Sequence, residues 1–384
     1  MKKIQMVDLL VQYDKIQEQL DSKILEVVKS GAYINGPEVH NFQKELEDYL
    51  NVKHVIPCAN GTDALQIAMM SLDLKPGDEV ITADFTFAAT VEVIALLQLI
   101  PVLVDVEAAT FNMNIEALKK AITPKTKAIV PVHLFGQCAN MEAVLEVAKA
   151  HNLFVIEDTA QAIGADYTFS DGTKKKAGTI GNIGTTSFFP SKNLGCYGDG
   201  GAIFTNDDEL AHILRGMVNH GMYKRYYHDV VGVNSRLDSI QAAILRIKLP
   251  LLDTYCNARR AAARYYNNGF KNNPNITTPK MGNGCEFICE NCDCHVFHQY
   301  TIQVKNVDRN ALHQHLLDSG IPNAIYYPVP LHSQKAYTDT RYKEEDFKVT
   351  NELINTVLSL PMHTELNTEQ LEFITSTILS FINN

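Results

Sequence analysis

Between about residues 54 and 206 the chain alternates short apolar runs with longer segments of helical periodicity. The runs HVIPC, EVITA, PVLVDV, KAIVPV and LFVIED are rich in Val and Ile and lack a regular polar alternation. Strands of this kind are covered on both faces, and strands that alternate with helices form parallel sheets. Two further β-type runs, TTSFF and AIFTN, end the region. The pattern therefore predicts an α/β domain with a mostly parallel sheet.

The first fifty residues predict helices separated by the turn INGP. After GVNSRLD, a long helical pattern broken at Pro250 leads into residues 271–294, a polar stretch that predicts a loop. The strand QYTIQV, the helix RNALHQHLLDSG, the segment YYPVP and the terminal helix TEQLEFITSTILSFI follow. A chain of 384 residues is long for one core. We therefore expect a large domain at residues 1–250 and a smaller α+β domain at residues 251–384.

The composition, with 46% hydrophobic and 20% charged residues, is that of an ordinary globular protein. A net charge of −10 argues against bulk nucleic-acid binding but allows a local basic pocket. The most apolar stretch, VIALLQLIPVLVDV, contains a Gln and a Pro and is too short to span a bilayer. Asp8 interrupts the N-terminal residues before a secretory segment can form. We expect a cytoplasmic protein with no nucleic-acid or membrane partner.

Cysteines cluster near residue 290. The cluster consists of Cys285, Cys289, Cys292 and Cys294, with His295 and His298 close behind. Only Cys289 and Cys292 have CxxC spacing, and the two paired knuckles that are usual for zinc are absent. Zinc is conceivable, but we expect no metal and a reduced, partly exposed surface loop. The other four cysteines are predicted to be small buried hydrophobic residues.

Lys192 lies between TTSFF and AIFTN and has no charged neighbour within six residues on either side. The run of small and glycine residues around it predicts a short connection beside the sheet. One interpretation is a snorkelling lysine, whose stem covers the core while its ammonium stays in water. The other is a lysine in a partly desolvated site, where the neutral amine can attack a carbonyl. The lysine alone does not decide between them.

Two other segments suggest a partner chemistry for this lysine. Gly61 and Thr62 follow a predicted strand and begin a helix, whose free N–H groups can bind phosphate. Asp158 closes another apolar strand, at the edge where α/β sheets bind ligands. Each is also compatible with an ordinary helix N-cap, Asp158 capping a predicted TAQAIG helix. Together, a lysine, an acid and a phosphate site are what pyridoxal 5′-phosphate (PLP) requires.

The chain resembles the DegT-type sugar aminotransferases. The segments that carry the resemblance are INGPEVHNFQKELEDYL, ANGTDALQIA, PGDEVITADFTFAATVE, VIEDTAQAIGA, TSFFPSKNLGCYGDGGAIFTNDDELA and GVNSRLDSIQAAIL. They extend over nearly the whole chain in the family's order. The resemblance implies an aspartate aminotransferase-like (type I) PLP fold, with a mixed, mostly parallel sheet in the large domain and a smaller α+β C-terminal domain.

The resemblance also implies roles for single residues. Lys192 matches the lysine that binds PLP covalently and later moves a proton, and Asp158 matches the partner of the pyridinium nitrogen. Gln161, one helical turn on, matches the residue near the phenolic oxygen of the ring, and Phe87 matches the aromatic residue that stacks on the ring. Gly61, Thr62 and Ser187 match the residues of the family's phosphate cradle.

Asn234 matches a residue that reaches the phosphate from the neighbouring subunit, which implies a homodimer with shared active sites. Arg236 matches a residue at the substrate pocket, and a buried arginine paired structurally with an acid is the other interpretation of it. Tyr326 and Tyr327 are also expected to contact the substrate. Enzymes of the family that act on a glucuronate carry a His-Tyr pair before Pro, where this chain has Tyr326-Tyr327. A tyrosine hydroxyl carries no charge and is a weaker partner for a sugar carboxylate than a histidine.

The implied reaction moves the amino group of glutamate to the 3-keto group of a nucleotide-linked sugar, with UDP-2-acetamido-2-deoxy-3-oxo-glucuronate as the expected acceptor in surface polysaccharide (O-antigen, lipopolysaccharide) biosynthesis. A dTDP-3-keto-6-deoxyhexose or a 4-keto nucleotide sugar is the alternative. A non-catalytic regulatory protein of the same fold is a more remote one. Sugar dehydratases of this fold carry histidine at the lysine position, so Lys192 argues against that activity.

Overall fold

The computed structural model describes residues 3–280 and 293–383, and its centre is a seven-stranded sheet with the order β1-β9-β8-β5-β4-β2-β3. The strands are β1 (His54–Cys58), β2 (Glu79–Ala83), β3 (Ile100–Val104), β4 (Thr126–Val130), β5 (Phe154–Asp158), β8 (Ile183–Ser187) and β9 (Gly201–Thr205). Only β9 runs antiparallel to its neighbours, β1 and β8. The predicted mostly parallel sheet is therefore confirmed.

Helices cover both faces of this sheet, as the apolar strands require. Along β2, Val80 packs into the cluster on one face and Ile81 into the cluster on the other. The first face is covered by α4 (Gly61–Ser71), α5 (Ala89–Leu96) and α8 (Asp208–Met217). The second is covered by α3 (Pro37–Leu50), α6 (Ile115–Ala121), α7 (Met141–His151) and α9 (Ser239–Lys248). Strand alternation thus sends successive residues into two separate cores.

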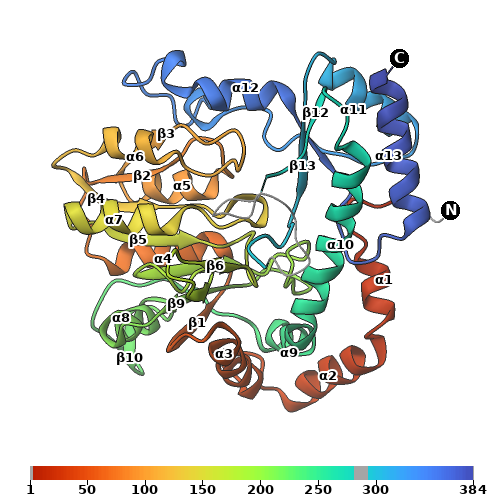
Figure 1. The fold of residues 1–384 in the computed structure, drawn as a ribbon. Helices are drawn as coiled ribbons and strands as arrows, with labels where there is room; N and C mark the ends of the chain where they lie inside the picture. The colour runs from red at the N-terminus through yellow and green to blue at the C-terminus, as the bar shows by residue number, and fades with distance from the viewer. Residues whose placement is uncertain (1–2, 281–292, 384) are drawn as a thin grey trace.

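A second, antiparallel sheet carries the C-terminal core. Its strands are β12 (Ile276–Thr277), β13 (Tyr300–Val304) and β14 (Val357–Leu360). The helices packed against it are α10 (Leu252–Phe270), α11 (Arg309–Asp318) and α13 (Thr368–Asn383). Helices α1 (Leu9–Asp14) and α13, near the two ends of the chain, lie on the same side of the molecule (Figure 1), and Ile4 joins the core of this sheet. The strand at 300–304, the helix after residue 308 and the terminal helix are confirmed.

The remaining elements connect these parts. They are α1 (Leu9–Asp14), α2 (Gln17–Ser30), α12 (Lys348–Thr356), and the hairpins β6 (Asp166–Thr168) with β7 (Lys174–Lys176) and β10 (Met222–Lys224) with β11 (Tyr227–His228). Helix α12, which the sequence analysis missed, lies beside the β3 edge of the large sheet (Figure 1). There the Asp105 carboxylate accepts hydrogen bonds from the backbone N–H groups of Val349 and Thr350. The division of the chain at residue 250 stays a prediction.

Two predicted elements were wrong in detail. Residues 159–164, expected to form a helix after Asp158, form a turn instead. The Thr159 backbone N–H is bonded to the Thr185 carbonyl of the neighbouring strand, and Gly164 has a φ of +90°, which ends any helical path. The predicted strand TTSFF ends at Ser187, since Phe188 and Phe189 begin the connection to β9.

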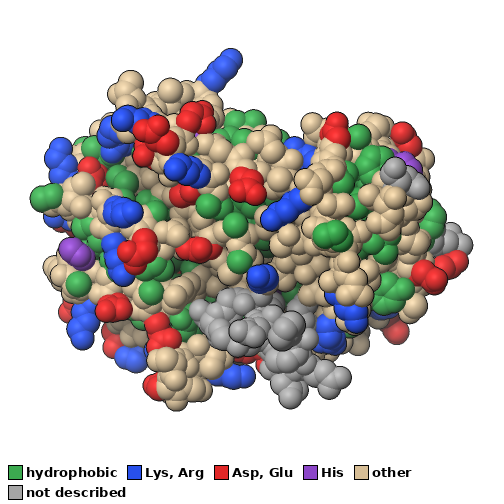
Figure 2. Space-filling model, turned by 45° about the horizontal axis from the view of Figure 1, so that its top comes forward, with side chains coloured by type: hydrophobic (Ala, Val, Ile, Leu, Met, Phe, Trp, Pro, Cys, Tyr) green, Lys and Arg blue, Asp and Glu red, His purple; other side chains and the backbone are tan. Residues whose placement is uncertain are grey.

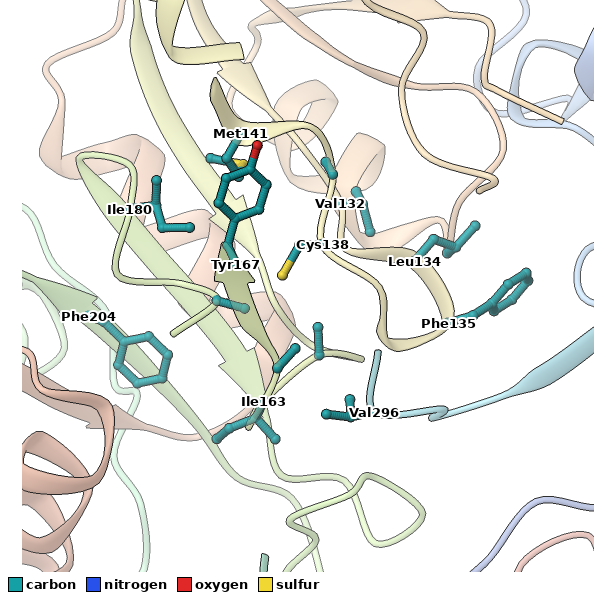
Figure 3. Close-up of a cluster of buried hydrophobic side chains, with 14 of the residues drawn as sticks. Val132, Leu134, Phe135, Cys138, Met141, Ile163, Tyr167, Ile180, Phe204 and Val296 are labelled. Atoms are coloured by element: carbon teal, nitrogen blue, oxygen red, sulfur yellow. The ribbon is translucent and has the colours of Figure 1, made fainter. Parts of the chain in front are cut away.

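The turn at 159–164 packs against a cluster of buried apolar side chains (Figure 3). Ile163, Tyr167 and Cys138 are buried there together with Val296, which comes from the C-terminal part of the chain. Because Val296 packs into the large-domain core, the residues that follow it are held close to the carboxyl edge of the large sheet. This contact brings the C-terminal region to the candidate site.

On the face drawn in Figure 2, Lys and Arg side chains alternate with Asp and Glu rather than forming one basic patch. Across the described ranges, no helix is both long enough and apolar enough to cross a membrane.

The cysteine cluster is described only in part. Cys285, Cys289 and Cys292 lie outside the described residues. Cys294 is only 8% exposed, so at this position the expected partly exposed loop is wrong. It is buried because the segment from residue 293 onward runs under α10: Arg260 donates to the backbone carbonyls of Asp293 and His295. Among residues 3–280 and 293–383, no group of three or more His, Cys, Asp and Glu side chains is arranged to hold a metal ion.

Helix α11 offers a test of the C-terminal core, because one of two adjacent leucines is buried and the other is exposed. Leu316 is 0% exposed and Leu317 is 42% exposed. We expect Leu316→Ala to lower the free energy of unfolding by about 2–5 kcal/mol, and Leu317→Ala to change it by about 0.5 kcal/mol or less. Urea unfolding of the two variants measures both values, and equal losses would contradict the orientation of α11.

Candidate active site

Lys192 lies on a tight connection between β8 and β9, at the edge of the sheet where the parallel strands end. Its backbone N–H donates to the Phe189 carbonyl at 2.8 Å, and Cys196 N–H donates to the Phe188 carbonyl at 2.8 Å. Gly195 passes so close to the Phe189 and Pro190 carbonyls that a Cβ atom there would collide with them. The connection is therefore closed on itself, and its path is fixed independently of the Lys192 side chain.

The Lys192 ammonium has no hydrogen-bond or ion-pair partner in the described part of the chain. Burial lowers its pKa to about 8, and the negative charge of Asp158 opposes the shift. A snorkelling lysine would keep its charge in water and an ordinary pKa. The structure therefore favours the second interpretation, an amine in a partly desolvated site with a sizeable neutral fraction near pH 8.

Asp158 ends β5, the strand next to β8, so it lies at the same sheet edge as Lys192. It is 5% exposed, and its carboxylate accepts hydrogen bonds from the Thr90 hydroxyl at 2.8 Å and from the Ala160 N–H at 3.1 Å. These two bonds hold the carboxylate without supplying a positive charge. Thr90 was not recognised in the sequence, because a threonine inside a helical segment carries no signal of its distant partner.

Gln161 and Tyr327 meet beside Asp158. The Gln161 side chain accepts from the Phe135 N–H at 2.7 Å and donates to the Tyr327 hydroxyl at 3.2 Å. Burial raises the pKa of Tyr327 far above its ordinary value, Gln161 opposes the shift, and the charge of Asp158 adds to it. Tyr327 is therefore a neutral phenol at physiological pH. The Phe87 ring, which is 58% exposed, also lies near Tyr327, with ring centroids 6.4 Å apart.

Gly61, Thr62 and Ser187 come together where α4 begins. Asn60 caps this helix by accepting from the Asp63 N–H at 2.8 Å, and its backbone carbonyl accepts from Ala64. The N–H groups of Gly61 and Thr62 have no partner among the residues that the structure describes. A Cβ atom on Gly61 would lie 2.7 Å from Ser187 Cβ, so only glycine leaves room there. Two free N–H groups, a hydroxyl and a helix N-terminus form a cradle suited to a phosphate.

The predicted Asn234 and Arg236 flank Ser235, which is buried. The Ser235 hydroxyl accepts from the Ala59 N–H at 3.0 Å, just before the cradle. Asn234 is exposed, and Arg236 donates to the Asn219 side chain at 3.4 Å. The structure thus places this segment beside β1 of its own chain. The expected approach of Asn234 to a neighbouring subunit stays a prediction, as does the place of Arg236 and Tyr326 in a substrate pocket.

Two further groups near the site were missed by the sequence analysis. Glu157 is fully buried, and its carboxylate accepts from the N–H groups of Ile180 and Gly181, each at 2.6 Å, and contacts His133 Nε2 at 3.0 Å. An acidic residue inside the apolar run LFVIED was a usable signal for such a network. The network locks the end of β5 and therefore the direction of Asp158.

His298 is the second group. It is 6% exposed, and its Nδ1 atom has no hydrogen-bond partner within the described residues. Burial, together with the positive charges of Lys192 and Arg259, holds the pKa of His298 well below its ordinary value, so the ring is neutral. In the sequence, His298 stands out only as a neighbour of the cysteine cluster.

The donor set fits PLP. Within the part of the chain that the structure describes, a free amine, an oriented carboxylate without a cationic partner, a side-chain amide and a cradle for phosphate all lie at one sheet edge. Each matches a different part of the cofactor. These four groups come from separate segments of the chain, and the sheet brings them together at its carboxyl edge.

Comparison with known proteins also indicates a PLP-dependent aminotransferase. The model of the DegT/DnrJ/EryC1/StrS aminotransferase family matches residues 14–379. UDP-2-acetamido-2-deoxy-3-oxo-D-glucuronate aminotransferase of Pseudomonas aeruginosa is 44% identical over 97% of this chain and 98% of its own. A pleiotropic regulatory protein of Geobacillus stearothermophilus is 43% identical over 98% of both chains. UDP-N-acetyl-3-dehydro-alpha-D-glucosamine 3-aminotransferase of Acidithiobacillus ferrooxidans is 41% identical over 98% of this chain and 97% of its own.

Among solved structures, NtdA of Bacillus subtilis, determined with the bound cofactor PMP, superimposes with a TM-score of 0.87 at 29% identity, covering 99% of this chain and 83% of NtdA. The expected PLP aminotransferase fold is confirmed.

The electrostatics of Lys192 give a testable pH dependence. With a pKa of about 8, roughly a quarter of the amine is neutral at pH 7.5, against about 0.1% for an ordinary lysine. In cofactor-free protein, we expect the rate at which an acylating reagent labels Lys192 to rise with pH through a midpoint near 8.

Peptide mass spectrometry after short labelling times separates the lysines. Lys119 is the control, because its hydrogen bond to Glu116 raises its pKa, so its labelling rises only at higher pH. Parallel pH profiles for Lys192 and Lys119 would mean that Lys192 is not desolvated.

Proposed function

The chain belongs to the DegT/DnrJ/EryC1/StrS aminotransferase family, and from this premise we propose that it transfers the amino group of glutamate to the 3-keto group of a nucleotide-linked sugar. The acceptor that we favour is UDP-2-acetamido-2-deoxy-3-oxo-glucuronate. The observation that carries the proposal is the unpaired Lys192 amine, which shares one sheet edge with the Asp158 carboxylate and the phosphate cradle.

Each residue has a physical task in this proposal. When bound, PLP supplies a ring that accepts the electron pair of the carbon–hydrogen bond that breaks during transfer. Lys192 moves the proton at Nζ, since its lowered pKa lets the amine act as acid or base near neutral pH. The Asp158 carboxylate holds the proton on the ring nitrogen. Thr90 and the Ala160 N–H keep that carboxylate in place.

The cradle and the aromatic wall position the cofactor. The N–H groups of Gly61 and Thr62 and the Ser187 hydroxyl bind the phosphate. When PLP is bound, the half-exposed Phe87 ring would stack on the cofactor ring, and Gln161, already fixed by its bond from the Phe135 N–H, would contact the phenolic oxygen. We place Asn234 at the phosphate of a neighbouring subunit, so that the active unit is a homodimer. Its exposure in the single chain leaves it available for this contact.

The acceptor sugar could carry a C6 carboxylate or lack one, and the two relatives differ on this point. The relative from Pseudomonas aeruginosa is named for a 3-oxo-glucuronate, whereas the one from Acidithiobacillus ferrooxidans is named for a 3-dehydro-glucosamine, which lacks the carboxylate. In our proposal Tyr326 and Tyr327 face the sugar, and the Tyr327 hydroxyl already binds Gln161. Arg236 remains the cationic candidate for a sugar carboxylate. A sugar without a carboxylate is therefore the second acceptor to test, and dTDP-linked and 4-keto sugars come next.

Cytoplasmic surface polysaccharide synthesis, including O-antigen and lipopolysaccharide, is the pathway class that we propose, because nucleotide sugars are its precursors. A regulatory role without catalysis is the remote alternative. One relative is named as a regulatory protein. The retained Lys192 argues for catalysis, since a scaffold has no need for a desolvated amine.

A half-reaction tests the proposal. The purified protein should carry a visible absorbance band from lysine-bound PLP, lose the band with glutamate, and regain it with one 3-keto nucleotide sugar. UDP- and dTDP-linked 3-keto and 4-keto sugars are offered separately, with and without a C6 carboxylate. Lys192→Ala is the control and should show no band at the start. A band that glutamate leaves unchanged would overturn the transaminase proposal, and recovery with a 4-keto sugar would replace the acceptor.

A further inference from the structure

A second lysine, Lys248, is buried beneath the connection that carries Lys192. It is the last residue of α9 and is 1% exposed. Its Nζ atom donates to the Gly195 carbonyl at 2.7 Å and lies 4.6 Å from the centre of the Tyr197 ring. Within residues 3–280 and 293–383, no carboxylate pairs with it. Both of its contacts are thus to the Lys192 connection.

The burial of this cation is not explained by stability. Taking an ammonium out of water costs several kcal/mol, and apolar residues of similar volume are often as stable or more so at such positions. Burial accordingly lowers the pKa of Lys248 to about 8. The neighbouring residues of α9, Ile244 and Leu245, are buried and apolar. A methionine would fill the same space, so the ammonium must be needed for what it binds.

What it binds is the turn from which Lys192 projects. Phe188 and Phe189 accept backbone hydrogen bonds from Cys196 and Lys192, so residues 188–196 form one closed turn. The Gly195 carbonyl belongs to that turn, and a glycine there has no side chain to anchor it. Lys248 supplies the anchor from α9.

Two further contacts hold this connection, one more from α9 and one from the C-terminal segment. On α9, the Gln241 side chain accepts from the Tyr197 N–H at 2.8 Å. On the opposite side, the Asn193 side chain donates to the Val296 carbonyl at 2.9 Å. Lys192 thus projects from a turn that is hydrogen-bonded both to α9 and to the C-terminal segment. Lys248 is the contact that carries charge, and charge-assisted hydrogen bonds are the stronger ones.

We propose that Lys248 is a positioning residue for Lys192. Its buried ammonium holds the Gly195 carbonyl and the Tyr197 ring, and thereby fixes the turn from which the Lys192 amine reaches the cofactor. This inference rests on the proposed function only in that Lys192 binds PLP. It does not depend on which sugar is the acceptor.

The experiment compares Lys248→Met with Lys176→Met in the full-length protein. Lys176 is a matched control, because its ammonium also lies over a tyrosine ring, that of Tyr49 at 5.2 Å, and bonds Asp166 at 3.0 Å, without touching the Lys192 turn. Two readouts are taken: amide hydrogen exchange of the peptide that covers residues 188–197, and the visible circular dichroism of lysine-bound PLP. The cofactor is achiral, so its dichroism reports the asymmetry that the site imposes.

With Lys248→Met, we expect exchange of the 188–197 peptide to become about tenfold faster or more, since the turn loses its anchor. The visible dichroism should fall at least by about half, and kcat for the half-reaction with glutamate should fall more than KM changes, since Lys192 moves the proton. Lys176→Met should speed exchange only in the β6–β7 hairpin and leave the dichroism unchanged.

The proposal is overturned if Lys248→Met leaves exchange of the turn unchanged, or speeds it while the dichroism stays as in the wild type. If Lys248→Met does not fold, Tyr197→Leu removes the ring under the ammonium and is judged by the same two readouts. Should no sugar be aminated, these measurements still decide the role of Lys248. If PLP does not bind to Lys192, there is no visible dichroism to compare. Hydrogen exchange of the cofactor-free protein then tests by itself whether Lys248 holds the turn.

Discussion

The site depends on keeping one amine unpaired inside the protein while holding it close to a carboxylate. An exposed lysine would be fully protonated at neutral pH, and a lysine paired with Asp158 would be held in its charged form. Here burial lowers the pKa of Lys192 to about 8 and Asp158 opposes the shift without forming an ion pair. The two groups influence each other at a distance, and the remainder of the site maintains that separation.

The sheet supplies this separation. Asp158 ends β5, Lys192 lies on the turn that follows the adjacent parallel strand β8, and different elements fix each of them. The Thr90 hydroxyl of α5 and the Ala160 N–H donate hydrogen bonds to the Asp158 carboxylate. Below it, Glu157 points to the other face of β5 and locks the strand end through backbone N–H groups. Lys192 depends instead on the closed turn after β8. Because the two residues are held by independent contacts, neither needs the other as a hydrogen-bond partner.

The C-terminal part of the chain completes the site rather than standing apart from it. Val296 packs into the large-domain core, and the neutral His298 follows two residues later. Tyr327 reaches Gln161 from a position 166 residues away in the chain. The Asp84 carboxylate, just after β2, bonds both the backbone N–H and the ring of His332 at 2.7 Å, which anchors the chain after the two tyrosines. The residues that we propose to face a substrate are thus fixed to the same sheet edge as those that we propose to face the cofactor.

Local patterns in the sequence determined the parallel sheet, the helix start at Gly61, and the isolation of Lys192 from other charges. These features depend on neighbours within a few residues, since apolar runs, caps and charge spacing act over one strand or one helical turn. The resemblance then predicted which residues share the site. The structure brought Gly61 close to Ser187, and Gln161 to Tyr327. Only the tertiary structure decided that residues 159–164 form a turn, that Thr90 orients Asp158, that His298 is a neutral neighbour of Lys192, and that Lys248 supports the Gly195 carbonyl. Each of these contacts joins residues far apart in the chain, and their energy comes from burial and hydrogen bonds that exist only once the sheet has formed.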